Sequence, residues 1–225
     1  MPDVVTALGV PNLTPRRPAR PGERAPDFAL HALRDDRIVS LADYRGRAAL
    51  LLVIERGLFC PFCRKHIAQL GVVSPKLGRL GVEVLAVFAT PAERARAYLA
   101  ARPAPIPLAA DPKHEVHQAY GLPRFASTPE TEARVDGALI DPFGDLPSPR
   151  PARQIADALS RDDPYEWTPA DQAAYDIGQI QTTGQFLVDR EGIVRWRNVE
   201  GAVTGLAGLG QFPSEKDLVA AAQEL

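Results

Sequence analysis

Both cysteines of the chain lie in one Cys-Pro-Phe-Cys stretch at residues 60–63, and this stretch constrains the fold more than any other feature. It closely follows the continuous aliphatic run 48–54, which predicts a strand buried on both faces. Pro61 suits the first position of a helix, and apolar residues at helical spacing continue to about Lys76. The pattern therefore predicts a cysteine pair at the junction of a buried strand and a helix.

The predicted position of Cys60 favours a reactive thiolate. At a helix N-terminus, unpaired backbone N–H groups and the helix dipole stabilise an anion. The pKa of a cysteine thiol there can fall from about 8.5 to between ~3.5 and ~7.5. Arg56, Arg64 and Lys65 add positive charge nearby in the sequence. Cys63, one turn further on, is placed to attack an oxidised or mixed-disulfide form of Cys60, so we expect Cys60 to attack and Cys63 to resolve.

Other interpretations of the cysteine pair compete with redox chemistry. The two thiols could be unreactive buried side chains, but charged residues surround them. A c-type haem attachment needs histidine directly after the second cysteine, where this chain has Arg64. A structural disulfide closing so short a loop would add little stability. A zinc site would need more ligands, and the remaining candidates are the histidines His31, His66, His114 and His117. We expect His114 and His117 to be surface or partly buried side chains.

Length and charge restrict the classes of function. The 225 residues allow one large domain with an insertion, and the net charge of -2 gives no general attraction to nucleic acid or anionic membranes. No apolar run approaches the roughly 18 residues of a membrane-spanning helix. The first residues show no basic segment followed by an apolar one. We therefore expect a cytoplasmic protein, in which a Cys-x-x-Cys motif is more often redox-active than structural.

Strand and helix patterns alternate after the cysteine motif, which predicts an α/β architecture. Thr90 with Glu93 predicts a capping box, and Asp111 is expected to cap a later helix that Gly121 ends. The last helix is expected to begin after Ser214. In order, the predicted segments are strand 81–88, helix 90–99, strand 106–110, helix 112–120 and hairpin 185–197.

Two segments depart from this alternation. Residues 1–20 are rich in proline and arginine and predict an extended N-terminal arm before a domain at 21–225. Residues 123–175 hold no clear strand, only short helical patterns at 153–160 and 168–175. So long a connection within a domain usually forms a lid, a binding element or a dimerisation element. Four aromatic residues could either line a pocket or pack the insertion onto the domain: Phe125, Phe143, Tyr165 and Trp167.

Several stretches resemble the peroxiredoxins, the alkyl hydroperoxide reductase/thiol-specific antioxidant family of the thioredoxin superfamily. They are Pro-Gly-Glu-Arg-Ala-Pro-Asp-Phe-Ala-Leu at 21–30, Ser-Leu-Ala-Asp-Tyr-Arg-Gly at 40–46, and the strand that leads into Cys60. Arg56-Gly57 before the cysteine motif is similar to a peroxiredoxin-like branch with an Arg-Gly-x-x-Cys-Pro-x-Cys pattern, as is segment 176–189. The resemblance covers 21–122 and 176–225. It implies a thioredoxin-like fold, a central mixed sheet flanked by helices, with the insertion before the last hairpin.

The resemblance also implies a function. Cys60 would be the peroxidatic cysteine and Cys63 its resolving partner, and a thioredoxin-like protein or a low-molecular-weight thiol would reset the disulfide. The substrate would be a hydroperoxide, and no metal or organic cofactor would be required. A homodimer is possible by the same resemblance, whereas nucleic acid and membrane partners are not expected.

Three positions depart from the usual peroxiredoxin pattern. Gly57 stands where that family has a threonine or serine, and Val53 where it has a proline. Thr183 stands where the family has a guanidinium and thioredoxins have a cis-proline. Arg56 and Thr183 are therefore the candidate site residues beside the two cysteines. Two alternatives stay open: a thiol–disulfide oxidoreductase acting on protein or small-molecule disulfides, and a redox-like fold that binds or tailors a small molecule with the insertion as its pocket.

Overall fold

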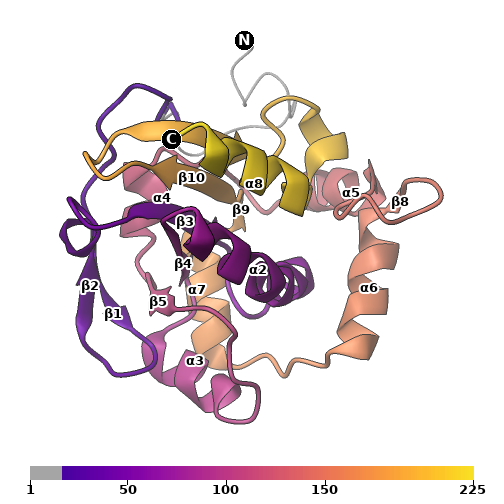
Figure 1. Ribbon diagram of the computed structural model, residues 1–225. Helices are drawn as coiled ribbons and strands as arrows, with labels where there is room; N and C mark the ends of the chain where they lie inside the picture. The colour runs from indigo at the N-terminus through magenta and orange to yellow at the C-terminus, as the bar shows by residue number, and fades with distance from the viewer. Residues whose placement is uncertain (1–16) are drawn as a thin grey trace.

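Residues 17–225, the part of the chain that the computed structural model describes, fold around a seven-stranded mixed sheet (Figure 1). Within it, β3, β4 and β5 run parallel, and the strands on either side of these three are antiparallel to their neighbours. The order across the sheet is β11-β10-β3-β4-β5-β1-β2. The bounds are β1 Ala29–Ala32, β2 Ile38–Ser40, β3 Ala49–Glu55, β4 Val82–Phe88, β5 Leu108–Ala110, β10 Gly184–Val188 and β11 Val194–Val199.

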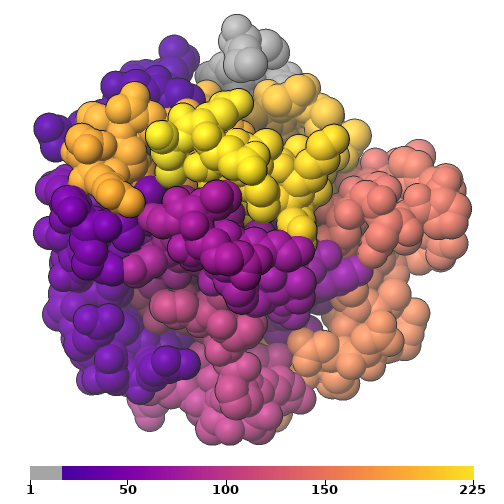
Figure 2. Space-filling view, viewed as in Figure 1, coloured from indigo at the N-terminus to yellow at the C-terminus, as the bar shows by residue number. Residues whose placement is uncertain are grey.

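Helices cover both faces of this sheet, as the family resemblance implies. Leu70, Ala95 and Leu218 bring three helices onto one face, and Val116 brings a fourth onto the other. In the space-filling view the yellow C-terminal helix lies directly against the purple helix that follows the cysteine motif (Figure 2). The bounds are α2 Pro61–Arg79, α3 Ala92–Leu99, α4 Glu115–Ala119 and α8 Glu215–Gln223, with short 3-10 turns η1 Leu41–Asp43 and η2 Gly205–Gly208.

Strand β3 occupies the middle of the sheet, and all seven of its residues are buried. Leu50, Leu52 and Ile54 contribute to the core on one face, and Leu51 and Val53 to the core on the other. The aliphatic run before the cysteine motif is therefore a strand packed on both faces, which confirms its prediction. Because both cores hold β3, the start of α2 is fixed relative to the whole sheet.

The segment 123–175 contains more regular structure than the sequence indicates. The two predicted helical pieces are confirmed as α6 and α7, but a further helix, α5, and two short strand pairs were not predicted. In Figure 1 the salmon-coloured α5 and α6 lie on the side of the molecule away from β1 and β2. The bounds are α5 Pro129–Gly137, α6 Ala152–Asp162 and α7 Pro169–Gly178, with β6 Arg124–Phe125 paired to β9 Ile180–Gln181 and β7 Leu139–Ile140 to β8 Arg150–Pro151.

The predicted capping box at Thr90 is wrong. Pro91 occupies the N-cap of α3, and no side chain caps it. The Thr90 hydroxyl instead accepts a hydrogen bond from the Leu58 N–H at 2.8 Å. Thr90 is fully buried two residues after β4, beside the loop that leads to the cysteine motif. The hydroxyl therefore holds that loop in place.

The helix expected to be capped by Asp111 begins three residues later than predicted, and its N-cap residue is His114. The Asp111 side chain nevertheless binds the first N–H groups of α4. The Asp111 carboxylate accepts hydrogen bonds from the N–H groups of Glu115 at 2.8 Å and Val116 at 2.9 Å. Gly121, with a φ of +71°, follows the helix end as predicted. The same residue lets the backbone of Arg17 and Pro18 pass closely, because a Cβ there would lie 2.2 Å from the Arg17 carbonyl oxygen.

The expectation that His114 and His117 lie at or near the surface is wrong. Both are buried. The His117 ring lies between the Asp111 carboxylate, 2.8 Å from Nδ1, and the Glu55 carbonyl oxygen, 2.9 Å from Nε2. His114 Nε2 lies 3.2 Å from the Ala174 carbonyl oxygen. The two rings therefore join α4 to β3 and to α7.

The ends of the described chain follow the sequence closely. Ser214 and Asp217 form the predicted cap of the last helix, and β10 and β11 form the predicted hairpin. Of the predicted N-terminal arm, residues 1–16 lie outside the described residues. Residues 17–20 have no regular structure, and the Ala19 N–H donates to the Tyr120 carbonyl oxygen at 3.1 Å. Within residues 17–225 no helix combines the length and apolar character needed to cross a membrane.

Candidate redox site

The two cysteines lie at the start of α2, as predicted. Cys60 is the N-cap residue, Cys63 is in the first turn, and a disulfide joins them with a Cα–Cα distance of 5.3 Å. The Cys60 Sγ accepts a hydrogen bond from the Cys63 N–H at 3.2 Å. Cys60 is 6% exposed and Cys63 is 0% exposed. Only Cys60 can therefore be reached by a substrate without rearrangement of the helix.

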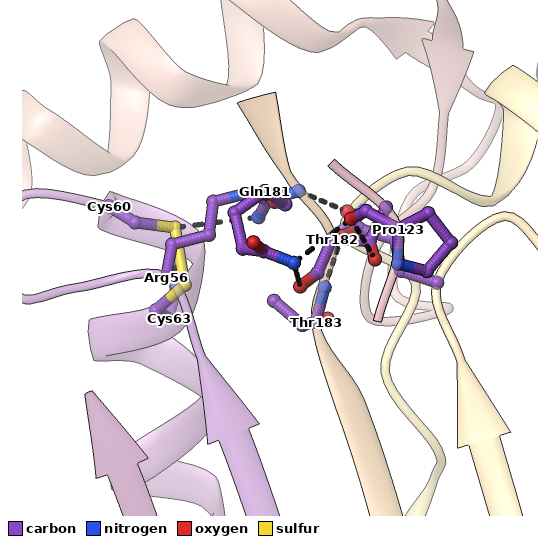
Figure 3. A network of polar contacts seen from close by, with 9 residues as sticks. Arg56, Cys60, Cys63, Pro123, Gln181, Thr182 and Thr183 are labelled. Carbon is purple, nitrogen blue, oxygen red and sulfur yellow. Dashed lines mark hydrogen bonds and ion pairs between the residues drawn. A yellow bond between two sulfur atoms is a disulfide. The ribbon is translucent and has the colours of Figure 1, made fainter. Parts of the chain in front are cut away.

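Arg56 is the cation that reaches the sulfur. Its Nη1 lies 3.7 Å from the Cys60 Sγ, and its Nε donates to the Gln181 carbonyl oxygen at 2.7 Å. Its Nη2 donates to the buried carboxylate of Glu200 at 2.5 Å. In Figure 3 the Arg56 side chain extends from the sulfurs toward Gln181. Three anchored nitrogens fix the guanidinium where it stabilises negative charge on Cys60.

Arg64 and Lys65, the other cations near the motif, do not face the sulfur. Arg64 is buried and donates to Asp163 at 2.5 Å and to the Leu58 carbonyl oxygen at 2.6 Å. Lys65 forms an ion pair with Asp145 at 3.2 Å. Because helical residues next to each other point in different directions, adjacency in sequence did not bring these charges to the thiol. Both instead fasten the insertion to α2.

Glu200 organises the site, and the sequence analysis did not identify it. Its side chain is fully buried, and besides Arg56 it accepts the Thr183 N–H at 2.8 Å and the Gly210 N–H at 2.5 Å. The residue directly follows β11. A lone acidic residue after a hairpin carries no signal for this role, because its partner Arg56 is 144 residues away. Only the fold brings the two together.

Thr183 belongs to the same network, but through its backbone. Its N–H donates to Glu200, which in turn holds Arg56. Among residues 17–225, its hydroxyl makes no hydrogen bond to either sulfur. Gln181 and Thr182 both donate to the Pro123 carbonyl oxygen, each at 2.9 Å (Figure 3). The segment before β10 is thus held beside the cysteines by the Thr183 N–H, the Gln181 side-chain amide and the Thr182 hydroxyl.

Steric crowding explains why position 57 is a glycine. A Cβ there would lie 2.4 Å from Cε1 of the Phe59 ring. That ring packs against Trp167, with ring centroids 4.9 Å apart, and against Tyr175 at 6.2 Å. The space that a threonine or serine would need is therefore filled by an aromatic cluster that joins the cysteine loop to the region of α7.

A second buried pair fastens α2 to the end of β3. His66 Nδ1 lies 2.6 Å from a carboxylate oxygen of Glu55, and neither side chain is more than 2% exposed. The His66 ring stacks on Phe212 with centroids 4.0 Å apart. Among the described residues, no cluster of three or more histidine, cysteine, aspartate or glutamate side chains could hold a metal ion.

A cavity of about 330 Å³ opens beside Cys60. Its walls come from the cysteine motif, from the insertion and from the loop after β11. Of the four aromatic residues considered as pocket walls, none lines it: Phe125 is buried, Phe143 stacks with Phe212, Tyr165 packs against Tyr98 and Trp167 covers Phe59. The lining residues include Phe59, Phe62, Val135, Ile140, Ala152, Tyr175, Ile180 and Leu209.

Comparisons with known proteins agree with this architecture. The model of the AhpC/TSA family matches residues 21–146, whereas no curated protein matches the sequence. The crystal structure of peroxidoxin BcpB from Mycobacterium tuberculosis aligns with a TM-score of 0.56 at 12% identity, covering 92% of this chain and 98% of that one. A putative thiol:disulfide interchange protein DsbE from Chlorobium tepidum aligns with a TM-score of 0.50 at 21% identity, covering 91% and 99%. The predicted thioredoxin-like fold is confirmed.

Proposed function

The chain belongs to the AhpC/TSA family, and we propose that it reduces hydroperoxides through the thiolate of Cys60. Family membership indicates a thiol oxidoreductase, and the peroxidase activity is our proposal. The observation that carries it is the environment of the Cys60 sulfur, which receives the Cys63 N–H at 3.2 Å and lies 3.7 Å from the Arg56 guanidinium. Both donors favour a thiolate over a thiol.

The reaction would proceed in two steps on the sulfurs. The Cys60 thiolate attacks the terminal oxygen of the hydroperoxide. An S–O bond forms, the O–O bond breaks, the alcohol leaves after taking up a proton, and Cys60 becomes a sulfenic acid. The Cys63 thiol then attacks the Cys60 sulfur and releases water. This condensation forms the Cys60–Cys63 disulfide, and it needs no further oxidant because the hydroperoxide has already taken both electrons in the first step.

Arg56 would act in the first step. Its guanidinium lies beside the attacking sulfur and is already held by Glu200 and the Gln181 carbonyl oxygen. A fixed cation at this place stabilises the thiolate and the negative charge that develops as the O–O bond breaks. Thr183 would be a positioning residue, because it reaches Arg56 only through Glu200.

Resetting the pair requires two electrons from an external thiol. The thiol attacks the more exposed sulfur of the disulfide, that of Cys60, and a second thiol releases the mixed disulfide. A thioredoxin-like protein or a low-molecular-weight thiol fits this step. No metal or organic cofactor is needed, because the thiols supply the electrons. Cytoplasmic location and homodimerisation stay predictions from the sequence.

A thiol–disulfide oxidoreductase is the second candidate function. The observations that favour it are the Cys-x-x-Cys spacing and the similarity in fold to a protein described as a thiol:disulfide interchange protein. The same two sulfurs would then exchange with a disulfide substrate. The two functions differ in one measurable respect, which is how much faster than an ordinary thiolate Cys60 reacts with a peroxide.

The experiment is stopped-flow oxidation of the fully reduced protein by hydrogen peroxide and by cumene hydroperoxide. We expect a second-order rate constant orders of magnitude above that of free cysteine at equal thiolate concentration. Cys60→Ser should remove this reaction, and Cys63→Ser should keep the first step. A wild-type rate no higher than that of free cysteine would reject the peroxidase and favour disulfide exchange.

A further inference from the structure

A second cavity, of about 310 Å³, opens between α2, α6 and the loop that joins β7 to β8. In Figure 1 α6 and β8 lie on the side of the molecule away from β1 and β2. This second cavity shares no lining residue with the cavity beside Cys60. A ligand bound in it would therefore be separate from the substrate of the redox site.

The walls of the second cavity are largely apolar. Ile155, Ala158 and Leu159 line it from α6, where residues three and four positions apart share one face of the helix. Phe143 and Leu146 line it from the loop between β7 and β8. Ile155 is buried, and the other four side chains are half-buried. The second cavity can therefore cover the apolar part of a ligand.

The loop that forms one wall is held in a fixed shape. Three of the residues 141–149 are prolines. The Asp141 carboxylate accepts hydrogen bonds from two backbone N–H groups of the same loop, at 3.2 and 3.4 Å. The Phe143 ring stacks on Phe212 with ring centroids 5.6 Å apart. Because this wall is already in place, little loss of conformational entropy would oppose the binding of a ligand.

Cations outnumber anions on the lining of the second cavity. Lys65, Arg150 and Arg161 line it, and Asp145 is the acidic residue that does so. Asp145 is paired with Lys65 at 3.2 Å. Within residues 17–225, the side chains of Arg150 and Arg161 make no hydrogen bond or ion pair. Guanidinium groups bind carboxylates and phosphates through two parallel hydrogen bonds, so both arginines offer donors to an anion.

The other acidic residues at this end of α6 do not neutralise the two arginines. Asp157 forms an ion pair with Arg153 at 2.9 Å. Asp162 follows Arg161 directly in the sequence, is exposed and does not line the second cavity. An anionic group in the second cavity would therefore meet unpaired positive charge beside an apolar wall.

From these observations we infer that the second cavity binds a small organic anion with an apolar body, either a carboxylate or a phosphate monoester. Arg150 and Arg161 would hold the anionic group, and the apolar walls would cover the remainder. At roughly 30 Å³ for each non-hydrogen atom, a cavity of about 310 Å³ holds about ten such atoms, which is the size of octanoate. The inference does not depend on the proposed peroxidase, because the two cavities have no residue in common.

The first test measures the binding of three probes to the full chain by calorimetric titration: octanoate, octyl phosphate and 1-octanol, which is uncharged. We expect at least one of the two anions to bind with a dissociation constant below about 1 mM, and 1-octanol to bind at least about tenfold more weakly. The tighter of the two anions identifies the head group. Equal binding of 1-octanol and the anions, or no binding of either anion, would overturn the inference.

The second test removes the charges one at a time. Arg150→Gln and Arg161→Gln should each weaken the binding of the tighter anion about fivefold and leave the binding of 1-octanol unchanged. The matched control is Arg79→Gln, which makes the same charge change at an exposed residue of α2 that does not line the second cavity. All three side chains are exposed, so the variants should fold as the wild type does. An equal loss in Arg79→Gln would mean that only the overall charge matters, and would reject the site.

The third test locates the bound anion without measuring activity. Octanoate should protect Arg150 and Arg161 from modification by phenylglyoxal, as measured by mass spectrometry of a peptide digest. Arg79 should be modified equally with and without octanoate. Protection of Arg153, which lines the cavity beside Cys60, in place of Arg150 and Arg161 would overturn the assignment to the second cavity.

Discussion

Glu200 is the residue on which the geometry of the redox site most depends. It is a fully buried carboxylate that holds Arg56 beside the Cys60 sulfur and ties down the start of β10 through the Thr183 N–H. Burial of a charge is costly, and the three donors around Glu200 offset that cost. Loss of the negative charge would leave the Arg56 guanidinium without its anionic partner.

The first prediction concerns Glu200→Gln. We expect the rate constant of Cys60 oxidation to fall about tenfold, because Arg56 is released, and the free energy of unfolding to fall by about 3 kcal/mol, because a buried ion pair is broken. Stopped-flow oxidation and denaturant unfolding measure the two effects. Glu191→Gln, at an exposed turn residue, is the control. Unchanged kinetics in Glu200→Gln would show that Arg56 does not need this partner.

The second prediction concerns pH and His114. Burial, aided by the charge of His117, lowers the pKa of His114 from its ordinary 6.5 to about 4. Between pH 4 and pH 6.5 the His114 side chain binds a proton in the unfolded chain but not in the folded protein. The free energy of unfolding should therefore decrease by about 3 kcal/mol as the pH falls from 6.5 to 4.

Denaturant unfolding at a series of pH values checks this prediction. His114→Gln should flatten the slope in that window, whereas His31→Gln, which changes an exposed histidine, should leave the slope as in wild type. The carboxyl groups of Asp171 and Asp189, whose pKa values are lowered from 3.8, act mainly below pH 4. A wild-type stability that is constant from pH 6.5 to 4 would contradict the account.

At the scale of residues, the sequence identified those site residues whose position depends only on their neighbours in the chain. Cys60 and Cys63 could be placed at a helix start because the motif, the preceding strand and Pro61 are contiguous. Their catalytic roles stay predictions. Glu200 could not be found, since its function depends on a contact across 144 residues. The burial of His114 and His117 was missed for the same reason, because α7 and β3 cover them from far along the chain.

At the scale of elements, α7 is held to the domain by Asp171. Its carboxylate accepts from the Tyr165 hydroxyl at 2.7 Å and the Thr168 hydroxyl at 2.7 Å, and it lies 3.1 Å from Nε of Arg94 on α3. Although burial opposes ionisation, these hydrogen bonds hold the pKa of Asp171 below its usual range. The Asp171 carboxylate thus joins the N-terminal cap of α7 to Arg94 of α3, a helix that covers the sheet.

The third prediction is that Asp171→Asn lowers the free energy of unfolding by about 2 kcal/mol, because a buried acceptor of several donors loses its charge. Asp176→Asn, at an exposed position of the same helix, should change it by less than about 0.5 kcal/mol. Thermal or denaturant unfolding checks both. Equal effects of the two substitutions would mean that Asp171 does not anchor α7.

Caps show why elements are predicted well and their ends less well. Ser214 and Thr168 cap their helices as the local pattern indicates, and each side chain accepts a hydrogen bond from the N–H three residues further on. Thr90 fits the same pattern and fails, because the Leu58 N–H takes its hydroxyl. Helix α5 was missed because only one of its residues, Thr131, is buried, so its apolar pattern is weak.

At the scale of the whole molecule, the fold builds the site from distant parts of the chain. The β3–α2 junction brings the sulfurs and Arg56, the end of β11 brings Glu200, and the insertion supplies the cavity. Contiguous apolar runs predicted an α/β architecture and the position of the cysteines, whereas the mixed sheet was implied by the family resemblance. The sequence left open a pocket formed by the insertion, but it did not identify the apolar walls, which come from segments that show no shared pattern.

The most direct measurement of the central claim uses Cys63→Ser, in which the first oxidised form of Cys60 cannot proceed to the disulfide. The reduced variant is mixed with one equivalent of cumene hydroperoxide and analysed over time by intact mass, with dimedone to trap sulfenic acid. The account predicts rapid gain of one oxygen atom at Cys60, far faster than oxidation of free cysteine, and one dimedone adduct. Oxidation no faster than that of free cysteine would contradict it.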